Sequence, residues 1–553
     1  MRPMLRRCVI ALTASAIVAV SFLSTSFMSA TSANGAGAAG GRTFRVGVLS
    51  DAASLDVARD TSALASEVWT LQYPRLTEYD ATDVTPIPGL ADSWSPSSDG
   101  LTYTYRLRGG LNWSDGTPLT SADVVASING ARTGHWPGTG DLSGLSARAA
   151  GPLTVVVHAS TLNQQLPSLP VHVVPKGDTS KLSIGSGPFV VWQRKPGFVR
   201  MVANDRYYGG RPFLDAVEFH VYPNGDALAA AIQRGDVDAV SGVPSNQFDK
   251  LNSNENVTTV VGNNGDYYAL ALDTRAAPLS DVRVRQALGF FVDRALLVQR
   301  YNNGVGRAAV TPTLARSTTW DFSLKVREQV EQQIDNDAGK ARGLLRASGA
   351  DRIDLAIGVA PNDAAGTRIV ATLADVMRGT PVHVAAAGAG GTSKVNAQLV
   401  LRVPGDDPDA VLRSFTCAAN QSWWCDPAYQ RMYAAESTSL DPAFRVATVR
   451  DMKRLLIAQS PEVPLFHTDR LEAYRSDRWK NVVRQPLDTG AAFFTLSAPT
   501  FVLIQQASQL GTNKVSAQAT LLAALAVAAI AVAALVAYFI VRARGSLRRT
   551  APT

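Results

Sequence analysis

The body of this 553-residue chain lacks an excess of charge of either sign. The whole sequence carries 53 Lys and Arg against 46 Asp and Glu, but seven of the arginines lie in residues 1–41 and 519–553, which contain no acidic side chain. Removing these seven leaves 46 basic against 46 acidic side chains. No basic stripe remains to neutralise phosphates, so we expect no nucleic-acid partner.

Sequence signatures of catalysis and metal binding are also missing. The six His residues show neither HExxH nor another paired-ligand spacing, which argues against a zinc site. Residues 185–187 lack the GxSxG spacing of a nucleophile, and the GxGxxG pattern at 35–40 precedes any strand, so it is typical of a linker. We therefore expect no cofactor, no metal and no catalytic residue, although scattered carboxylates that meet in space could still form a hydrolase site.

Cysteine is scarce, with three residues in the whole chain. Cys8 follows two arginines at the start of an apolar run, where the cysteine of a lipobox does not lie, so we expect no acyl anchor. Cys417 and Cys425 remain in the body. An even count in an oxidising compartment favours a disulfide between them, with two free thiols as the alternative.

Long hydrophobic runs occur at the two ends of the chain. Residues 1–41 combine a basic start, an apolar stretch and small residues, which predicts a secretory signal peptide and linker, or else an uncleaved signal anchor. Residues 519–541 are almost entirely apolar and long enough for a transmembrane helix, with a buried core helix as the alternative. The four arginines in the tail, 542–553, place that tail in the cytoplasm. The predicted location is the cell membrane, with the body outside.

Strand and helix patterns alternate along the body. Residues 101–108 place apolar and polar side chains on opposite faces, as a half-buried strand does, and a capped helix begins at Thr120 or Ser121. A single long helix is predicted over 281–304, and 211–240 reads as strand, turn and helix. This alternation indicates an α/β fold.

Five segments, in this order, carry a family resemblance. They are "DGLTYTYRLRGGLNWSDGTPLTSADVV" (99–125), "GSGPFVVWQRKPGFVRMVANDRYYGGRPFLDAVEF" (185–219), "AAIQRGDVDAV" (230–240), "DVRVRQALGFFVDRALL" (281–297) and "AQSPEVPLFHTDRLEAYRSDRW" (458–479). The chain resembles the extracytoplasmic solute-binding proteins of family 5, which serve dipeptide, oligopeptide and nickel ABC importers.

The resemblance implies a two-lobed, periplasmic-binding-protein-like α/β fold of class II, with an extra inserted domain and, in this chain, the C-terminal transmembrane helix. The implied parts are lobe I at 42–74, 186–262 and 470–502, the inserted domain at 75–185, lobe II at 263–469, a juxtamembrane linker at 503–518, the transmembrane helix at 519–541 and the basic tail at 542–553.

The resemblance also points to a ligand site in lobe II. Peptide-binding members carry an acidic residue just before a DPD-like turn, and Asp407-Pro408-Asp409 matches that turn. The position three before Asp407 is Pro404, so Asp406 is the candidate that replaces the acid. The other candidates, each with a structural role as the alternative, are Arg402 and Arg413 for a carboxylate, Trp423 and Trp424 for the cleft wall, and Asp56 and Asp60 for the cleft edge.

The predicted function is that of a receptor rather than an enzyme. The chain would close on a small solute, most simply a short peptide, and present it to the permease and ATPase subunits of an ABC importer. Two alternatives remain open, an envelope regulator or scaffold on the same fold and an extracytoplasmic hydrolase.

Overall fold

The computed structural model describes residues 42–507, with gaps at 177–178, 180–181, 263–264, 335, 388–393, 420–422 and 488. The predicted signal segment, 1–41, and the predicted transmembrane helix, 519–541, lie outside the described residues. Within the described ranges, no helix is both long and apolar enough to cross a membrane.

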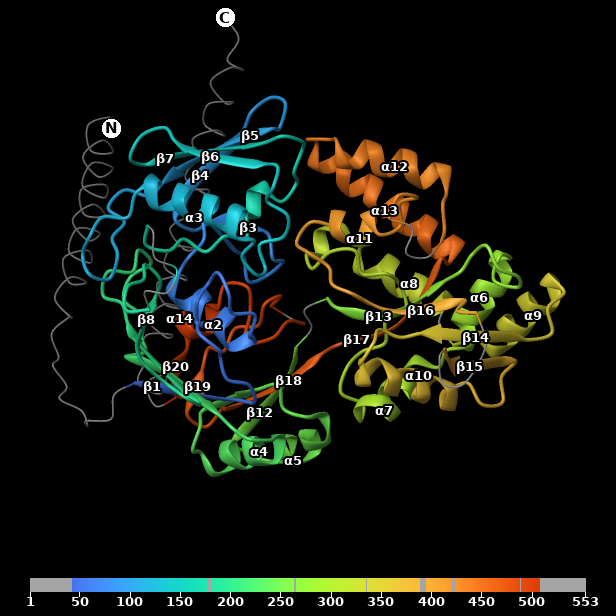
Figure 1. Cartoon of the computed structure of the whole chain (residues 1–553). Helices are drawn as coiled ribbons and strands as arrows, with labels where there is room; N and C mark the ends of the chain where they lie inside the picture. The colour runs from blue at the N-terminus through green and yellow to red at the C-terminus, as the bar shows by residue number, and fades with distance from the viewer. Residues whose placement is uncertain are drawn as a thin grey trace, which may run out of the picture. The chain divides into compact units, whose positions relative to one another are not determined.

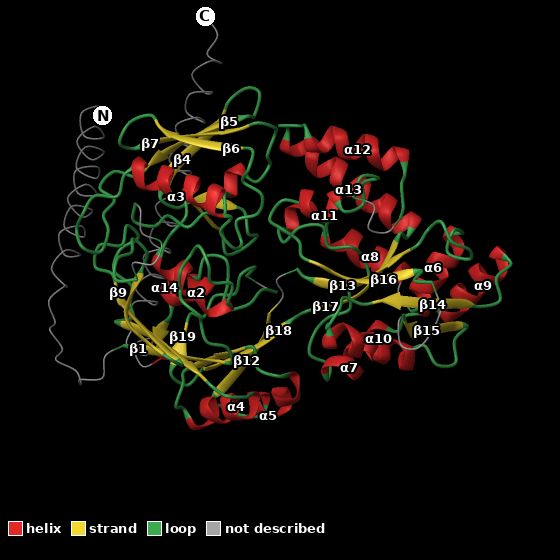
Figure 2. Ribbon diagram, in the orientation of Figure 1, coloured by secondary structure: helices red, strands yellow, loops and turns green. Residues whose placement is uncertain are grey.

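A seven-stranded mixed sheet contains the first described strand, β1, and one strand from near the end of the chain, β18 (Figure 2). Its order is β12 (Val257–Gly262), β18 (Arg470–Arg475), β11 (Ala239–Ser241), β1 (Thr43–Val48), β10 (Ala216–Val221), β9 (Phe198–Ala203) and β8 (Phe189–Lys195). The central strand β1 is parallel to β10 and β11, and its side chains Phe44 and Val46 are fully buried. Helices α2 (Ala63–Gln72), α4 (Gly225–Arg234) and α5 (Phe248–Asn252) contact strands of this sheet.

A five-stranded sheet forms the second large layer. Its order is β15 (Val382–Ala386), β14 (Ile353–Gly358), β16 (Ala397–Arg402), β13 (Tyr267–Leu272) and β17 (Glu462–His467). Helices α6 (Val282–Phe291) and α9 (Ala338–Ser348) pack against each other on one side of it, and α7 (Arg294–Asn302) and α10 (Ala364–Val376) do so on the other (Figure 1).

The helix predicted over 281–304 is in fact two helices. Helix α6 ends at Phe291, and Asp293 then caps α7 by accepting a hydrogen bond from the backbone N–H of Leu296 at 2.8 Å. An Asp inside an apolar helical pattern can therefore start a new helix, because its carboxylate satisfies amide groups that would otherwise lack acceptors.

A four-stranded antiparallel sheet contains the strand expected at 101–108. The sheet order is β4 (Ala91–Pro96), β5 (Thr102–Leu107), β7 (Thr154–Ala159) and β6 (Leu145–Ala149), and α3 (Ser121–Gly134) packs on it. In β5, Tyr103, Tyr105 and Leu107 are buried whereas Thr104 and Arg106 are exposed, so the predicted alternation is confirmed.

The remaining elements are short or connect these sheets. They are the strand pairs β2 (Thr77–Tyr79) with β3 (Pro86–Pro88) and β19 (Trp479–Lys480) with β20 (Gln505–Gln506), the helices α8 (Leu324–Ile334), α11 (Asp409–Arg413), α12 (Pro427–Ser437), α13 (Pro442–Gln459) and α14 (Pro499–Leu503), and the single 3-10 turns η1 (Leu166–Ser168), η2 (Ser245–Gln247) and η3 (Thr318–Trp320). Residues 503–507, assigned above to a linker, belong to the folded body, since Ile504 is fully buried.

The chain passes between the two large sheets on neighbouring strands. Strand β12 leads into β13, and β17 leads directly into β18 (Figure 1). Two such connections give a natural hinge between the sheets.

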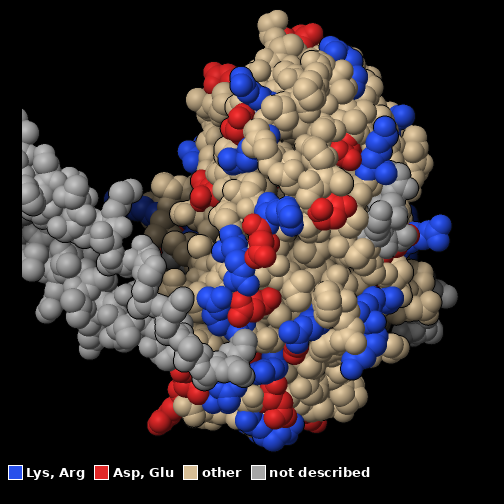
Figure 3. Space-filling model, turned by 90° about the vertical axis from the view of Figure 1, so that its left-hand side faces the viewer, with Lys and Arg blue, Asp and Glu red and all other residues tan. Residues whose placement is uncertain are grey.

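The predicted disulfide between Cys417 and Cys425 is present, and it closes the loop between α11 and α12. Charges on the surface are mixed in sign, with basic and acidic side chains interspersed on the face that Figure 3 shows. This distribution agrees with the balance of charge in the body.

A buried carboxyl group lies beside the start of β18. Glu67 of α2 is 2 % exposed, and its Oε1 atom has no hydrogen-bond partner among the described residues. Burial and the neighbouring Glu472 raise the pKa of Glu67 to about 8, while Arg470 and the backbone N–H of Phe494 partly oppose that rise. Glu67 is therefore largely protonated at neutral pH.

We predict that Glu67 makes the folded chain less stable as the pH rises. Between the ordinary value of 4.5 and the folded pKa of about 8, the folded state holds a proton that the unfolded state has lost. The free energy of unfolding should fall by about 1.4 kcal/mol per pH unit across that range. Urea titrations at pH 5.5 and pH 7.5 should show this fall in the wild-type chain and a much smaller one in Glu67→Gln. Equal slopes in both chains would contradict the assignment.

Candidate functional site

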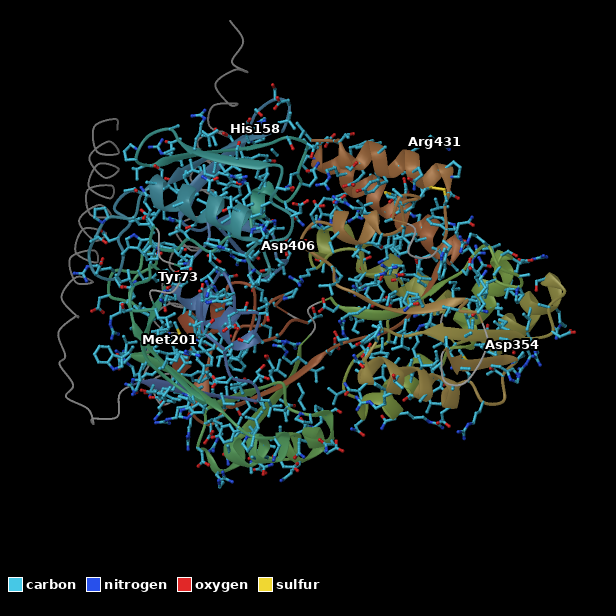
Figure 4. All side chains as sticks on the ribbon, viewed as in Figure 1. Tyr73, His158, Met201, Asp354, Asp406 and Arg431 are labelled. Carbon is cyan, nitrogen blue, oxygen red and sulfur yellow. A yellow bond between two sulfur atoms is a disulfide. The ribbon has the colours of Figure 1, made fainter. Side chains whose placement is uncertain are left out.

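A cavity of about 300 Å³ lies where four parts of the chain meet. One wall comes from α2 and the segment after it, a second from residues 137–140 and 165–172, a third from Arg316 and residues 405–407, and a fourth from Thr495 and Leu496. Figure 4 labels Asp406 where the loop after β16 approaches the elements around α2 and α3. Residues distant in sequence thus form one site.

Asp406 presents a carboxylate to this cavity. Its Oδ1 atom is buried and makes no hydrogen bond to any described residue. Burial raises the pKa of Asp406, and a hydrogen bond to Tyr79 and the charges of Arg316 and Arg75 partly oppose the rise. A buried oxygen without a donor is costly, so this position favours a ligand that brings a donor.

Arg75 presents a cation from another wall of the same cavity. Its side chain is 8 % exposed, and its Nε atom has no hydrogen-bond partner within the described ranges. Glu78 accepts from Nη2 at 3.2 Å, the carbonyl of Leu496 accepts from the same nitrogen, and the guanidinium lies 4.6 Å from the ring centre of Tyr79. These contacts fix the guanidinium and leave Nε for an acceptor. No sequence motif identifies Arg75, because its place in the cavity depends on neighbours from remote segments.

His172 adds a neutral group to the cavity wall. Its Nδ1 lies 2.6 Å from the carbonyl oxygen of Tyr73, and since a carbonyl can only accept, Nδ1 carries the proton and Nε2 is an acceptor. Burial and the nearby Arg75 lower the pKa of His172 to about 3. The imidazole therefore stays neutral at physiological pH.

Asp407 lines the cavity, yet its two carboxylate oxygens are already in use. Arg445 donates to Oδ2 at 2.8 Å and to Oδ1 at 3.1 Å, and the backbone N–H of Asp409 also donates to Oδ1. Arg445 pairs with Glu436 as well, and burial raises the pKa of Glu436 to about 7 although Arg445 lowers it. Asp407 therefore fixes the turn that positions Asp406.

The predicted arginines lie outside the lining of this cavity. Arg402 is 5 % exposed and forms an ion pair with Glu462 at 2.9 Å, so its charge is compensated within the protein. Arg413 pairs with Asp409, which also accepts a hydrogen bond from Tyr433 at 2.7 Å. Arg413 and Asp409 line a second cavity, of about 670 Å³, which shares Gly140 and Gln165 with the first. A ligand larger than the first cavity could extend into this space.

The two predicted tryptophans lie away from both cavities. Trp424 is 6 % exposed and packs edge-on against Tyr429, with ring centres 5.2 Å apart. Trp423 lies under the guanidinium of Arg275 at 5.4 Å. Trp424 therefore belongs to the core, whereas Trp423 is partly exposed.

The two predicted aspartates after β1 hold the local backbone. Asp60 accepts hydrogen bonds from the backbone N–H groups of Ser54, Leu55 and Ser62. Burial alone would raise the pKa of Asp60, but these bonds lower it to about 2. Asp56 accepts from the backbone N–H of Ala58. Both carboxylates therefore stabilise the turn after β1. This is the structural role given above as the alternative to ligand binding.

Direct contacts join the walls at the mouth of the second cavity. The side-chain amide of Gln164 donates to the carbonyl oxygen of Ser437, the last residue of α12, at 3.3 Å and to that of Ser439 at 3.1 Å. The Leu440 side chain packs against Gly100, where a Cβ atom would lie 2.5 Å from it. We call these contacts of Gln164 and Leu440 the mouth contacts.

Comparison with known proteins identifies the family. The middle region of the bacterial extracellular solute-binding proteins of family 5 matches residues 85–384, more than half of the chain. The chain belongs to this family.

Relatives agree with this assignment. Protein XP55 of Streptomyces lividans is 26% identical over 439 residues, which cover 73% of this chain and 80% of that protein. The dipeptide-binding protein of Escherichia coli is 26% identical over 483 residues, covering 75% and 87%. The structure of HbpA2 from Haemophilus parasuis aligns with a TM-score of 0.69 at 20% identity, over 84% of this chain and 99% of that one. The fold is that of the periplasmic binding proteins.

We predict that the ion pairs of Arg445 hold the turn before α11. Arg445→Met would leave Asp407 and Glu436 buried without a cation, so the free energy of unfolding should fall by about 3–5 kcal/mol. Chemical denaturation measures this. The matched control is Arg413→Met, because the Arg413 side chain is 68% exposed and its pair with Asp409 should contribute less than about 1 kcal/mol. Similar losses in the two variants would show that the buried pairs have no special role.

Proposed function

We propose that this family 5 protein captures a small solute, most simply a short peptide, in the cavity lined by Arg75 and Asp406, and delivers it to the permease and ATPase of an ABC importer. One observation carries the proposal. A single cavity contains a buried carboxylate oxygen and a buried guanidinium nitrogen, both without partners among the described residues. A ligand with one cationic and one anionic end satisfies both groups.

The recognition chemistry follows from those two atoms. The ammonium group of a peptide would donate to Oδ1 of Asp406, and its carboxylate would accept from Nε of Arg75. Charge-assisted hydrogen bonds of this kind are roughly twice as strong as neutral ones. The imidazole Nε2 of His172 would accept from an amide N–H of the ligand. The dipeptide-binding relative supports a peptide as the first ligand class to test.

Capture would depend on movement of the two large sheets about the β12–β13 and β17–β18 connections. Arg75 belongs to the segment after α2, and Asp406 to the loop after β16, so a bound zwitterion would link the two sides. Such a ligand stabilises the closed arrangement by its differential affinity for it. In this proposal the body works outside the cell, held at the membrane through residues 519–541, and the permease recognises the closed form.

Removing the Asp406 charge should weaken peptide binding. We expect Asp406→Asn to lower affinity for short peptides at least about tenfold, because a charged hydrogen bond contributes about 1.5–3 kcal/mol. Isothermal titration with a dipeptide and tripeptide library measures it. Asp56→Asn is the control and should bind as the wild-type chain does, since Asp56 lies outside the cavity. If no peptide binds the wild-type chain, or Asp406→Asn binds equally well, peptide capture at this site is wrong.

The mouth contacts should hold the ligand-free chain partly closed. Gln164→Ala removes two hydrogen bonds, each contributing about 0.5–1.5 kcal/mol, and should favour a more open form. Small-angle X-ray scattering of the ligand-free chain should then give a larger radius of gyration than for the wild type. Gln193→Ala, at an exposed position on β8, is the control. An unchanged scattering profile in Gln164→Ala would mean that these contacts do not govern closure.

A further inference from the structure

A separate cavity of about 220 Å³ lies on the five-stranded-sheet side of the chain. Residues of α6, α9, the end of α13 and β17 line it, and none of them lines the cavity of Asp406. Its walls are largely apolar and include Phe290, Leu344 and Leu456. The proposed peptide capture makes no use of this space.

Arg285 places a buried cation in this apolar wall. The residue is 4% exposed, and no carboxylate of the described residues lies within ion-pair distance of it. Its guanidinium donates to four backbone carbonyls, those of Leu279, Ser280, Gln459 and Ser460.

These bonds do not exhaust or neutralise the group. A guanidinium has five N–H groups, and the described acceptors engage Nε, both N–H groups of Nη1 and one of Nη2, which leaves one N–H over. Burial lowers the pKa of Arg285, although Asp281 raises it somewhat. An arginine remains charged, and a buried charge without a counter-ion costs several kcal/mol. An anion in the cavity would lower that cost.

Gly289 keeps room for such a ligand. It lies inside α6 and lines the cavity, and a Cβ atom at this position would meet no described atom within 4 Å. Glycine in a helix interior costs about 1 kcal/mol relative to alanine. Neither close packing nor a positive φ requires glycine here, and the missing side chain leaves this part of the cavity open.

A second basic side chain lies at the cavity of Arg285. Lys340 of α9 lies over the ring of Phe290, with Nζ 4.3 Å from the ring centre. The one acidic residue in the lining, Glu462, already engages Tyr267 through Oε1 and Arg402 through Oε2. With the charge of Glu462 compensated in this way, an entering anion would meet the buried guanidinium of Arg285.

We propose that this cavity binds a small organic carboxylate with an apolar body, its charge toward Arg285 and its apolar part beside Gly289, Phe290 and Leu344. The cavity is smaller than the usual ligand pocket of about 300–1,000 Å³, which suits a single-ring or short branched acid. This second site is independent of the peptide cavity.

Phenylacetate is a suitable probe for the full chain, with phenylacetamide as its uncharged counterpart. Isothermal titration should show one saturable phenylacetate site with a Kd of about 1 mM or tighter, and at least tenfold weaker binding of phenylacetamide. Gly289→Leu should reduce phenylacetate affinity at least tenfold, because leucine fills the cavity, while the chain stays as stable as the wild type or becomes more so.

Gly343→Leu is the matched control. Gly343 lies inside α9, a Cβ atom there also meets no described atom within 4 Å, and the residue does not line the cavity. This variant should bind phenylacetate as the wild type does. The proposal is overturned if phenylacetate shows no saturable binding, if it binds Gly289→Leu unchanged, or if phenylacetamide binds equally well. None of these results depends on whether the chain binds peptides.

Discussion

The buried ion pairs of Arg445 are the constraint on which the site depends. Arg445 holds Asp407 and Glu436 at once, and Asp407 in turn accepts the backbone N–H of Asp409. Arg445 belongs to α13, so a helix later in the chain holds the turn before α11 in place. Replacing such pairs with apolar residues is often neutral, but removing one member leaves a buried charge. The main effect of these ion pairs is therefore to hold Asp406 in its position in the cavity, rather than to add net stability.

Two atoms without hydrogen-bond partners among the described residues give the cavity of Asp406 its chemical character. Folding normally satisfies buried polar atoms, so an unpartnered Oδ1 on Asp406 and Nε on Arg75 in one cavity indicate where a ligand completes the structure. The same reasoning applies to Arg285 in the smaller cavity. Its surroundings are largely apolar, and the charge without a described counter-ion is positive. Under the two proposals, the larger cavity binds a zwitterion and the smaller one an apolar acid.

Much of the fold could be predicted from the sequence, because it depends on local pattern. The alternation in β5, the cap of the helix after it and the disulfide between Cys417 and Cys425 each follow from a few adjacent residues or a simple count. The five family segments predicted the binding-protein fold for the same reason. The error over 281–304 was also local, since the apolar pattern continues through Asp293 and only its capping bond shows that a new helix begins.

The ligand site could be predicted only in part. The sequence by itself determined the fold class and the balance of charge, and it proposed the region around Asp406 as a candidate site, since these need only composition, periodicity and motif. It did not distinguish Asp406 from Asp407, identify Arg75, or show that Glu462 neutralises Arg402. Tertiary structure decided these points, because a charged side chain is available to a ligand only when no distant part of the chain has already neutralised it, and that depends on which residues folding brings within hydrogen-bond distance.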